Sequence, residues 1–294
     1  DNLHVSNCAE MNGDDGENCN LSVINIARIE TYEELLAIAI LLYKFQKAIT
    51  QGQYIFKDDQ AKINQNSRIG IGITGVLSDF EKNKEWGSRL YEDLREFDIE
   101  YSKEMNYPQS IKLTVQKPDG TLGLLMGTKA GIHLDNSPFW YRTVRFASND
   151  PLLEVLKEKG YKIEDKLNFD GTSDPSLKVV YFVCKSDTPQ MTELNTSAVD
   201  QINFNIDWQE AFVDQSVSQT VKFQHEEVEG IIEYLNKNYK DKIKAISFLR
   251  HSNFSFPQMP YQTISEEDYN DYMGKVQPLG NINLDKHDEF GLDD

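Results

Sequence analysis

Two of the three cysteines in the chain lie close to its start, and a carboxylate stands beside the first of them. Cys8 and Cys19 flank a short polar segment, and Glu10 follows Cys8 by two positions. A thiol and a carboxylate at positions i and i+2 on extended or looped backbone point to the same side. Both groups could therefore face one substrate, with the thiol as a redox or nucleophilic centre and the carboxylate as a base.

A purely structural interpretation of the same residues stands beside this one. Most cysteines in intracellular proteins are small buried hydrophobes, and most carboxylates are solvated. Cys-x-Glu by itself is a weak motif. The third cysteine, Cys184, lies within the apolar residues 178–185, where core packing explains it best.

Composition and charge exclude several classes of protein. The 294 residues are 39% hydrophobic and 27% charged, which indicates a globular chain. The net charge of −18 argues against a nucleic-acid binder and against attraction to anionic membranes. Three cysteines suit a reducing compartment, and the sequence shows no signal peptide and no apolar run of membrane-spanning length. We therefore expect a cytoplasmic protein.

The pattern of apolar residues predicts alternating strands and helices. We expect strands at residues 21–26, 68–75, 110–116, 139–146, 178–185, 217–223 and 245–249. We expect helices at residues 31–49, 78–97, 151–160, 197–214, 226–239 and 266–273. This alternation predicts an α/β fold with mostly parallel strands. We expect one domain over residues 1–280, followed by a loose acidic tail over residues 281–294.

A second candidate site follows the predicted strand at residues 110–116. There the chain reads Lys117-Pro118-Asp119-Gly120-Thr121-Leu122. A strand that ends in a Pro/Gly turn and opens onto small residues can cradle phosphate with backbone amides. The same residues also fit an ordinary Pro-Asp-Gly turn.

Several segments, taken in order, resemble the C-terminal half of a ribonucleotide reductase large subunit. The similarity is greatest to the adenosylcobalamin-dependent class II, in its monomeric, triphosphate-reducing branch, and it covers nearly the whole chain. The matching segments are Asn7-Cys8-Ala9-Glu10, residues 15–21, residues 68–75, residues 117–121 with Gly131-Ile132-His133, residues 141–145, residues 214–218 and residues 257–261.

The resemblance implies a ten-stranded α/β barrel with a finger loop at its centre. This chain would supply the finger loop and the second half of the barrel. The N-terminal half, on a separate chain or in a missing segment, would supply the rest and a cysteine to pair with Cys19. Because the chain begins at Asp1 without a methionine, we expect that residues before it were removed or come from another chain.

The resemblance also implies roles for individual residues. Cys8 would carry a thiyl radical, Glu10 would act as the base, and Cys19 would supply reducing electrons. Ser6 and Asn7 would contact the ribose, and backbone amides of Pro118, Asp119, Gly120, Thr121 and Leu122 would hold the phosphates. The implied partners are adenosylcobalamin, a ribonucleoside tri- or diphosphate and a thioredoxin-like reductant.

The chain departs from the family pattern at three places. Ser6 and Asn7 stand where the family has Asn and Pro, and Asp119 replaces Ser or Glu. The chain also ends without the family's C-terminal cysteine pair. These departures keep open an inert half-barrel that binds nucleotide or a protein partner. A glycyl-radical enzyme is a weaker alternative. His133 and His251 have no second ligand at metal spacing, so we expect no metal site.

Overall fold

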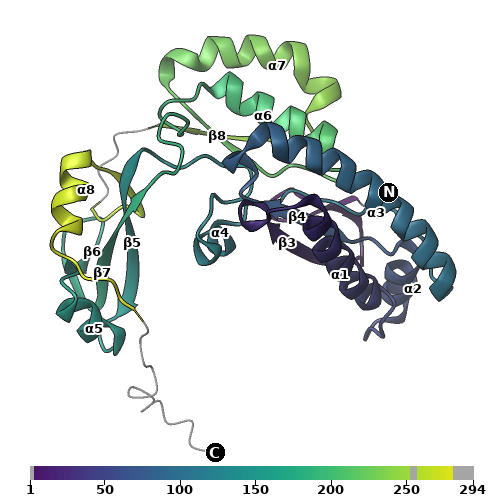
Figure 1. Cartoon of the computed structure of the whole chain (residues 1–294), viewed down its shortest axis with the longest axis horizontal. Coiled ribbons are helices and arrows are strands. Elements are labelled where there is room, and N and C mark those ends of the chain that lie inside the picture. The colour runs from purple at the N-terminus through teal and green to yellow at the C-terminus, as the bar shows by residue number, and fades with distance from the viewer. Residues whose placement is uncertain (1–2, 252–256, 281–294) are drawn as a thin grey trace, which may run out of the picture. The chain divides into compact units, whose positions relative to one another are not determined.

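The computed structural model describes residues 3–251 and 257–280, which form two compact units (Figure 1). Unit 1 comprises residues 1–134 and 196–251, and unit 2 comprises residues 135–195 and 252–294. The assignment of residues 1–280 to a single domain therefore stays a prediction. The predicted acidic tail at residues 281–294 lies outside the described residues.

Unit 1 is built on parallel strands, as the sequence predicts. Strand β3 (Leu21–Asn25) pairs with β4 (Gly70–Thr74), and β8 (Thr220–Phe223) pairs with β9 (Ser247–Arg250). Parallel bridges join Ile71 to Thr114 and Gln116 to Val217, which connects the two pairs through residues 113–116. Among the described strands, β3 and β9 end this order, and each has one partner. All five residues of β4 are buried, so this strand lies in the core.

Helices follow the strands of unit 1. The bounds are α1 (Tyr32–Thr50), α2 (Lys57–Asn66), α3 (Phe80–Met105), α4 (Gly120–Met126), α6 (Ala198–Ala211) and α7 (Val228–Lys242). Thr31 caps α1 as predicted, because its hydroxyl accepts from Glu34 N–H at 3.2 Å. Helix α3 runs eight residues beyond its predicted end at Phe97, and the sequence pattern missed α2 and α4.

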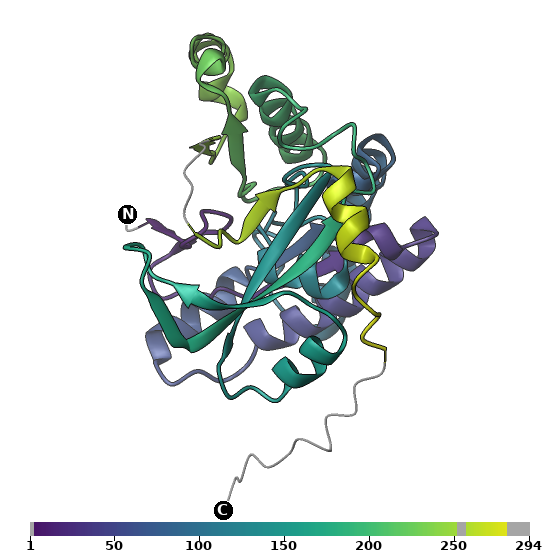
Figure 2. The same cartoon turned by 90° about the vertical axis from the view of Figure 1, so that its left-hand side faces the viewer.

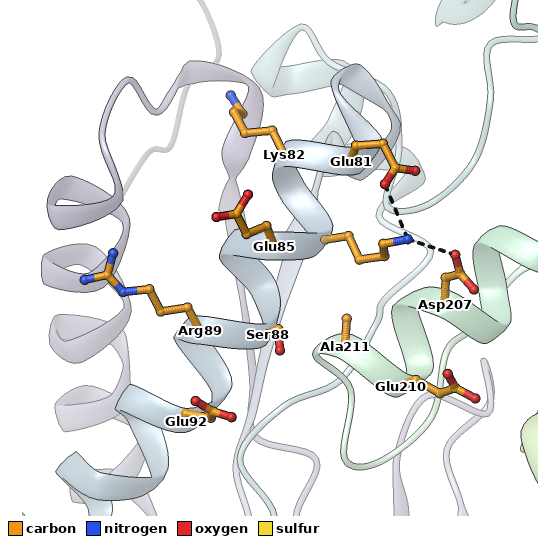
Figure 3. A pocket seen from close by; sticks show the side chains of 10 residues that line it. Glu81, Lys82, Glu85, Ser88, Arg89, Glu92, Asp207, Glu210 and Ala211 are labelled. Atoms are coloured by element: carbon orange, nitrogen blue, oxygen red, sulfur yellow. Dashed lines mark hydrogen bonds and ion pairs between the residues drawn. The ribbon is translucent and has the colours of Figure 1, made fainter.

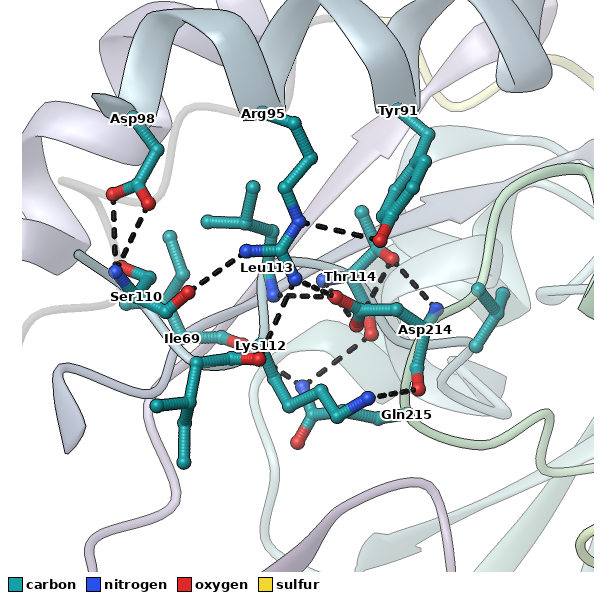
Figure 4. Close-up of polar contacts among 12 residues, drawn as sticks. Ile69, Tyr91, Arg95, Asp98, Ser110, Lys112, Leu113, Thr114, Asp214 and Gln215 are labelled. Carbon is teal, nitrogen blue, oxygen red and sulfur yellow. Dashed lines mark hydrogen bonds and ion pairs between the residues drawn. The ribbon is translucent and has the colours of Figure 1, made fainter. Parts of the chain in front are cut away.

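Residues 110–116 run extended but do not form a regular strand, because a side chain takes part of their hydrogen bonding. The carboxylate of Asp214 accepts from the N–H groups of Leu113 and Thr114, each at 3.1 Å. The same carboxylate accepts from Arg95 of α3 at 2.5 Å (Figure 4). Asp98, one turn further along α3, accepts from Ser110 N–H at 3.0 Å. This network fixes the segment that leads into the Lys117 loop.

An open hollow of about 990 Å³ lies on the surface of unit 1 between α3 and α6 (Figure 3). Its lining is mostly charged. Lys84 pairs there with Glu81 at 3.4 Å and with Asp207 at 3.1 Å. These ion pairs join the two helices across the hollow.

Unit 2 contains an antiparallel sheet with the strand order β10-β5-β7-β6 (Figure 2). The strands are β5 (Phe139–Ala147), β6 (Ile163–Leu167), β7 (Ser173–Lys185) and β10 (Tyr261–Thr263), accompanied by α5 (Leu152–Glu158) and α8 (Glu266–Met273). The expectation of mostly parallel strands is wrong for this unit. The turn between β6 and β7 is too short for a crossover, so these two strands form a hairpin.

No helix in the described parts of the chain is long and apolar enough to cross a membrane.

Candidate functional site

The first candidate residues lie at the tip of a hairpin, the finger loop, formed by β1 (Leu3–Val5) and β2 (Asn12–Asp14). Ser6 closes the tip. Its N–H donates to Met11 O at 2.9 Å, and its hydroxyl accepts from Met11 N–H at 3.1 Å. The observed contacts of Ser6 therefore shape the loop, and its contact with a substrate stays a prediction.

Cys8 and Glu10 lie in different surroundings although only Ala9 separates them. Ala9 has a φ of 59°, a left-handed conformation that interrupts the alternation of an extended chain. Cys8 and Asn7 are exposed, whereas Glu10 is 6% exposed. The argument that residues i and i+2 share one side is therefore wrong for this loop.

The main chain and the side chain of Glu10 have separate roles. Its carbonyl oxygen accepts from Ser216 N–H at 3.1 Å, which fastens the finger loop to the segment at residues 215–218. Its side-chain Oε2 is buried and has no hydrogen-bond partner among the described residues. A buried carboxylate oxygen without a donor is an acceptor available to a bound molecule.

Cys19 brings the candidate residues together. Partial enclosure of its thiol raises the pKa of Cys19, and the negative charge of Glu10 raises it further. Ionisation of Cys8 acts in the same direction, whereas the ammonium of Lys117 lowers the pKa. These interactions place Cys8, Glu10 and Lys117 within electrostatic reach of Cys19, and the thiol is neutral at neutral pH.

The predicted phosphate loop leads into α4, which begins at Gly120. The first N–H groups of a helix have no acceptor within the helix, so the amides of Gly120, Thr121 and Leu122 can serve a ligand. Gly120 and Thr121 are exposed, and a Cβ added to Gly120 would meet nothing within 4 Å. Gly131 supports the loop from behind, because a Cβ there would lie 2.4 Å from Lys117 O.

The side chain of Asp119 turns away from these exposed amides. It is fully buried, with Oδ1 3.6 Å from Lys117 Nζ, and neither oxygen has a hydrogen-bond partner in the described structure. Burial raises the pKa of Asp119, and Lys117 opposes this shift. The negative charge expected next to a polyphosphate is therefore inside the protein and partly suppressed.

His133 has a structural role in the observed structure. Its Nδ1 lies 3.2 Å from Ala130 O, and its Nε2 accepts from Thr220 N–H at 3.1 Å. Burial lowers the pKa of His133, so the ring is neutral. Within residues 3–251 and 257–280 we find no group of three or more His, Cys, Asp or Glu that could hold a metal ion.

Two residues of the site were not selected from the sequence. Lys117 was read only as the start of a turn, and Ser216 only as part of a matching segment. The available signal was the position of each at the end of an extended segment, where neighbouring parallel strands bring their ends together.

Comparison with known proteins gives the family. The chain is 29% identical over 279 residues to an adenosylcobalamin-dependent ribonucleoside-triphosphate reductase of Euglena gracilis, covering 92% of this chain and 37% of that protein. A reductase of the same name from Lactobacillus leichmannii is 28% identical over 294 residues, covering 89% and 39%. The chain is related to the adenosylcobalamin-dependent ribonucleotide reductases. No protein-family model matches it.

A solved structure confirms the fold expected for a ribonucleotide reductase. A B12-dependent class II ribonucleotide reductase superposes with a TM-score of 0.84 at 24% identity, covering 95% of this chain and 43% of that chain. The predicted α/β fold of the ribonucleotide reductase type is therefore confirmed. The chain spans about two fifths of the length of these reductases.

Proposed function

We propose that this chain is the finger loop and second half-barrel of a ribonucleotide reductase that converts ribonucleotides to 2′-deoxyribonucleotides. The observation that supports this most is the meeting of Cys8, Glu10 and Cys19. One thiol is exposed at a loop tip, a buried carboxylate oxygen is unbonded, and a second thiol responds to both. An N-terminal half, in the same polypeptide or in another, would complete the barrel.

The relatives' name points to adenosylcobalamin as the cofactor and to a ribonucleoside triphosphate as the substrate. The exposed thiol of Cys8 fits a cofactor that must reach the finger loop from outside. Both ring nitrogens of His133 are occupied, so His133 is not available as a cobalt ligand. When bound, the cofactor would supply the radical that the protein side chains use.

The side chains would then act in sequence. Cys8, as a thiyl radical, takes the 3′-hydrogen of the ribose, and Glu10 accepts the 3′-hydroxyl proton at its unbonded Oε2. The 2′-hydroxyl leaves as water, and Cys19 with a second thiol from the N-terminal half supplies two electrons and becomes a disulfide. Cys8 finally returns its hydrogen to the sugar.

The substrate phosphates would bind at the start of α4. The exposed amides of Gly120 and Thr121 are available there, and the Asp119 carboxylate is turned inward. Asn7 and Ser6, at the loop tip, would lie beside the ribose. A thioredoxin-like protein would reduce the disulfide again, and such a reductant fits a cytoplasmic location.

The test is deoxynucleotide formation by the full-length natural protein with adenosylcobalamin and a dithiol. We expect Cys8→Ser to abolish turnover, and we expect Cys184→Ser, in unit 2, to retain it as the matched control. Retained turnover in Cys8→Ser would overturn the assignment. If the unaltered protein binds nucleotide triphosphates and forms no deoxynucleotide with any N-terminal half, the non-enzymatic module is correct.

A further inference from the structure

Lys117 occupies a position that the proposed reaction has not yet used. Its side chain passes over β4 at a place where that strand has no side chain of its own. A Cβ added to Gly72 would lie 3.7 Å from Lys117 Cγ, so a longer residue at position 72 would take the space of the lysine. A Cβ at Gly70 would lie 2.8 Å from Val115 Cγ1. The two glycines therefore make room for Val115 and Lys117.

The ammonium of Lys117 lies among acidic groups from three segments. Asp119 Oδ1 is 3.6 Å away, and its side chain is fully buried. Glu10 of the finger loop is buried with Oε2 unbonded, and its charge acts on both Asp119 and Cys19. Cys8 and Cys19 are the other titratable groups in this set. Lys117 is the cation recorded as acting on Cys19.

The proposed reaction needs a charge on Cys19 at one stage. Two thiol S–H bonds break and one S–S bond forms, while the C–O bond of the sugar is replaced by C–H. Two electrons pass to the sugar, one hydrogen ends on its carbon, and the other ends in the released water. When Cys19 gives its proton to the departing hydroxyl, a thiolate forms beside the carboxylate of Glu10. Such like-charge proximity is unfavourable unless a cation lies close by.

We propose that Lys117 is a positioning residue for Cys19, and that its ammonium, held between Glu10 and Asp119, stabilises the thiolate formed during reduction. The proposal rests on the proposed function for its role in turnover. Asp119 is the competing partner of Lys117. Burial keeps the pKa of Asp119 raised, so its neutral form leaves the ammonium free to act on Cys19.

The experiment measures the ionisation of Cys19 directly, without turnover. The reduced full-length protein is alkylated with iodoacetamide between pH 7 and pH 11. Cleavage after Glu17 then separates Cys19 from Cys8 for mass spectrometry. We expect Lys117→Met to raise the midpoint for Cys19 by about half to one pH unit. Lys117→Arg keeps the charge and is expected to restore the midpoint.

The controls separate a local effect from a general one. Lys103→Met removes an equally charged, exposed residue near the end of α3 and is expected to leave the midpoint unchanged. Asp119→Asn releases Lys117 and is expected to lower the midpoint, which gives a second test if Lys117→Met does not fold. Equal midpoints for Lys117→Met and Lys103→Met, or no shift in Asp119→Asn, would overturn the proposal.

Turnover then distinguishes this proposal from the proposed function. If Lys117 served only the substrate phosphates, Lys117→Met would raise KM and leave the Cys19 midpoint in place, and the proposal would be wrong. If the protein formed no deoxynucleotide at all, the alkylation result would still stand, because it requires neither substrate nor cofactor.

Discussion

The ion pair between Arg95 and Asp214 gives a sharp test of how the site is supported. The side chains of Arg95 and Asp214 are 28% and 8% exposed, and the same carboxylate accepts from the N–H groups of Leu113 and Thr114. Asp214→Ala removes the partner of a largely buried cation and leaves two amides without an acceptor. Loss of one member of a buried pair costs roughly 3–5 kcal/mol. We expect about 3 kcal/mol, near the lower limit, because Arg95 keeps some exposure and still donates to Ser110 O.

A surface pair on the same helix provides the matched control. Arg89 and Asp93 lie 3.9 Å apart with side chains 59% and 33% exposed, so Arg89→Met should cost less than about 1 kcal/mol. Urea unfolding followed by hydrogen exchange in the peptide containing residues 110–116 reports on unit 1 separately from unit 2. An Asp214→Ala cost below about 1 kcal/mol, or equal to that of the control, would refute the reasoning. A double-mutant cycle with Arg95→Met isolates the pairwise term.

Three further predictions concern the loop and the thiols. Gly131→Ala should displace the loop and lower the melting temperature, because φ is 55° and the new Cβ would lie 2.4 Å from Lys117 O; an unchanged melting temperature would contradict the packing described. The pKa of Asp119 is raised above its unfolded value of about 3.9, so its ionisation destabilises the folded state as pH rises through that interval. Asp119→Asn should therefore be more stable than the unaltered protein at pH 7 and equal to it near pH 3, and equal stability at both pH values would count against burial of a charge. Burial raises the pKa of Cys184 to about 11, so its thiolate fraction at pH 8 is about one in a thousand, and native alkylation should be at least about 100-fold slower than at an ordinary thiol such as Cys8; comparable rates would show that Cys184 is not packed as described.

The sequence predicted the elements whose signals are local. Thr31 caps α1, Ser197 caps α6, and the apolar run around Ile71 forms a fully buried strand. The strand at Ile163–Leu167 was missed because its sequence, Ile-Glu-Asp-Lys-Leu, is mostly charged and none of its residues is fully buried. Its place in the sheet depends on pairing with β7, and a pattern within one segment does not contain that information.

The candidate site divides in the same way. Cys8, Glu10 and Cys19 were found because their types and order match a family. Their burial was not predicted, because it depends on the left-handed conformation of Ala9 and on the bond from Ser216 to the finger loop. Lys117 was missed as a site residue because its reach depends on glycines in β4, which is distant in sequence and adjacent only in the folded sheet.

The one-sided pairing of β3 and β9 affects how this chain behaves in solution. The outer edge of such a strand offers backbone N–H and C=O groups to any extended segment, including another copy of the same chain. The net charge of −18 keeps copies apart by repulsion. Salt shortens the range of that repulsion to about 10 Å at 0.1 M and to about 3 Å at 1 M. Self-association by strand addition is therefore expected to increase with ionic strength, and adding the half-barrel that completes the sheet should suppress it.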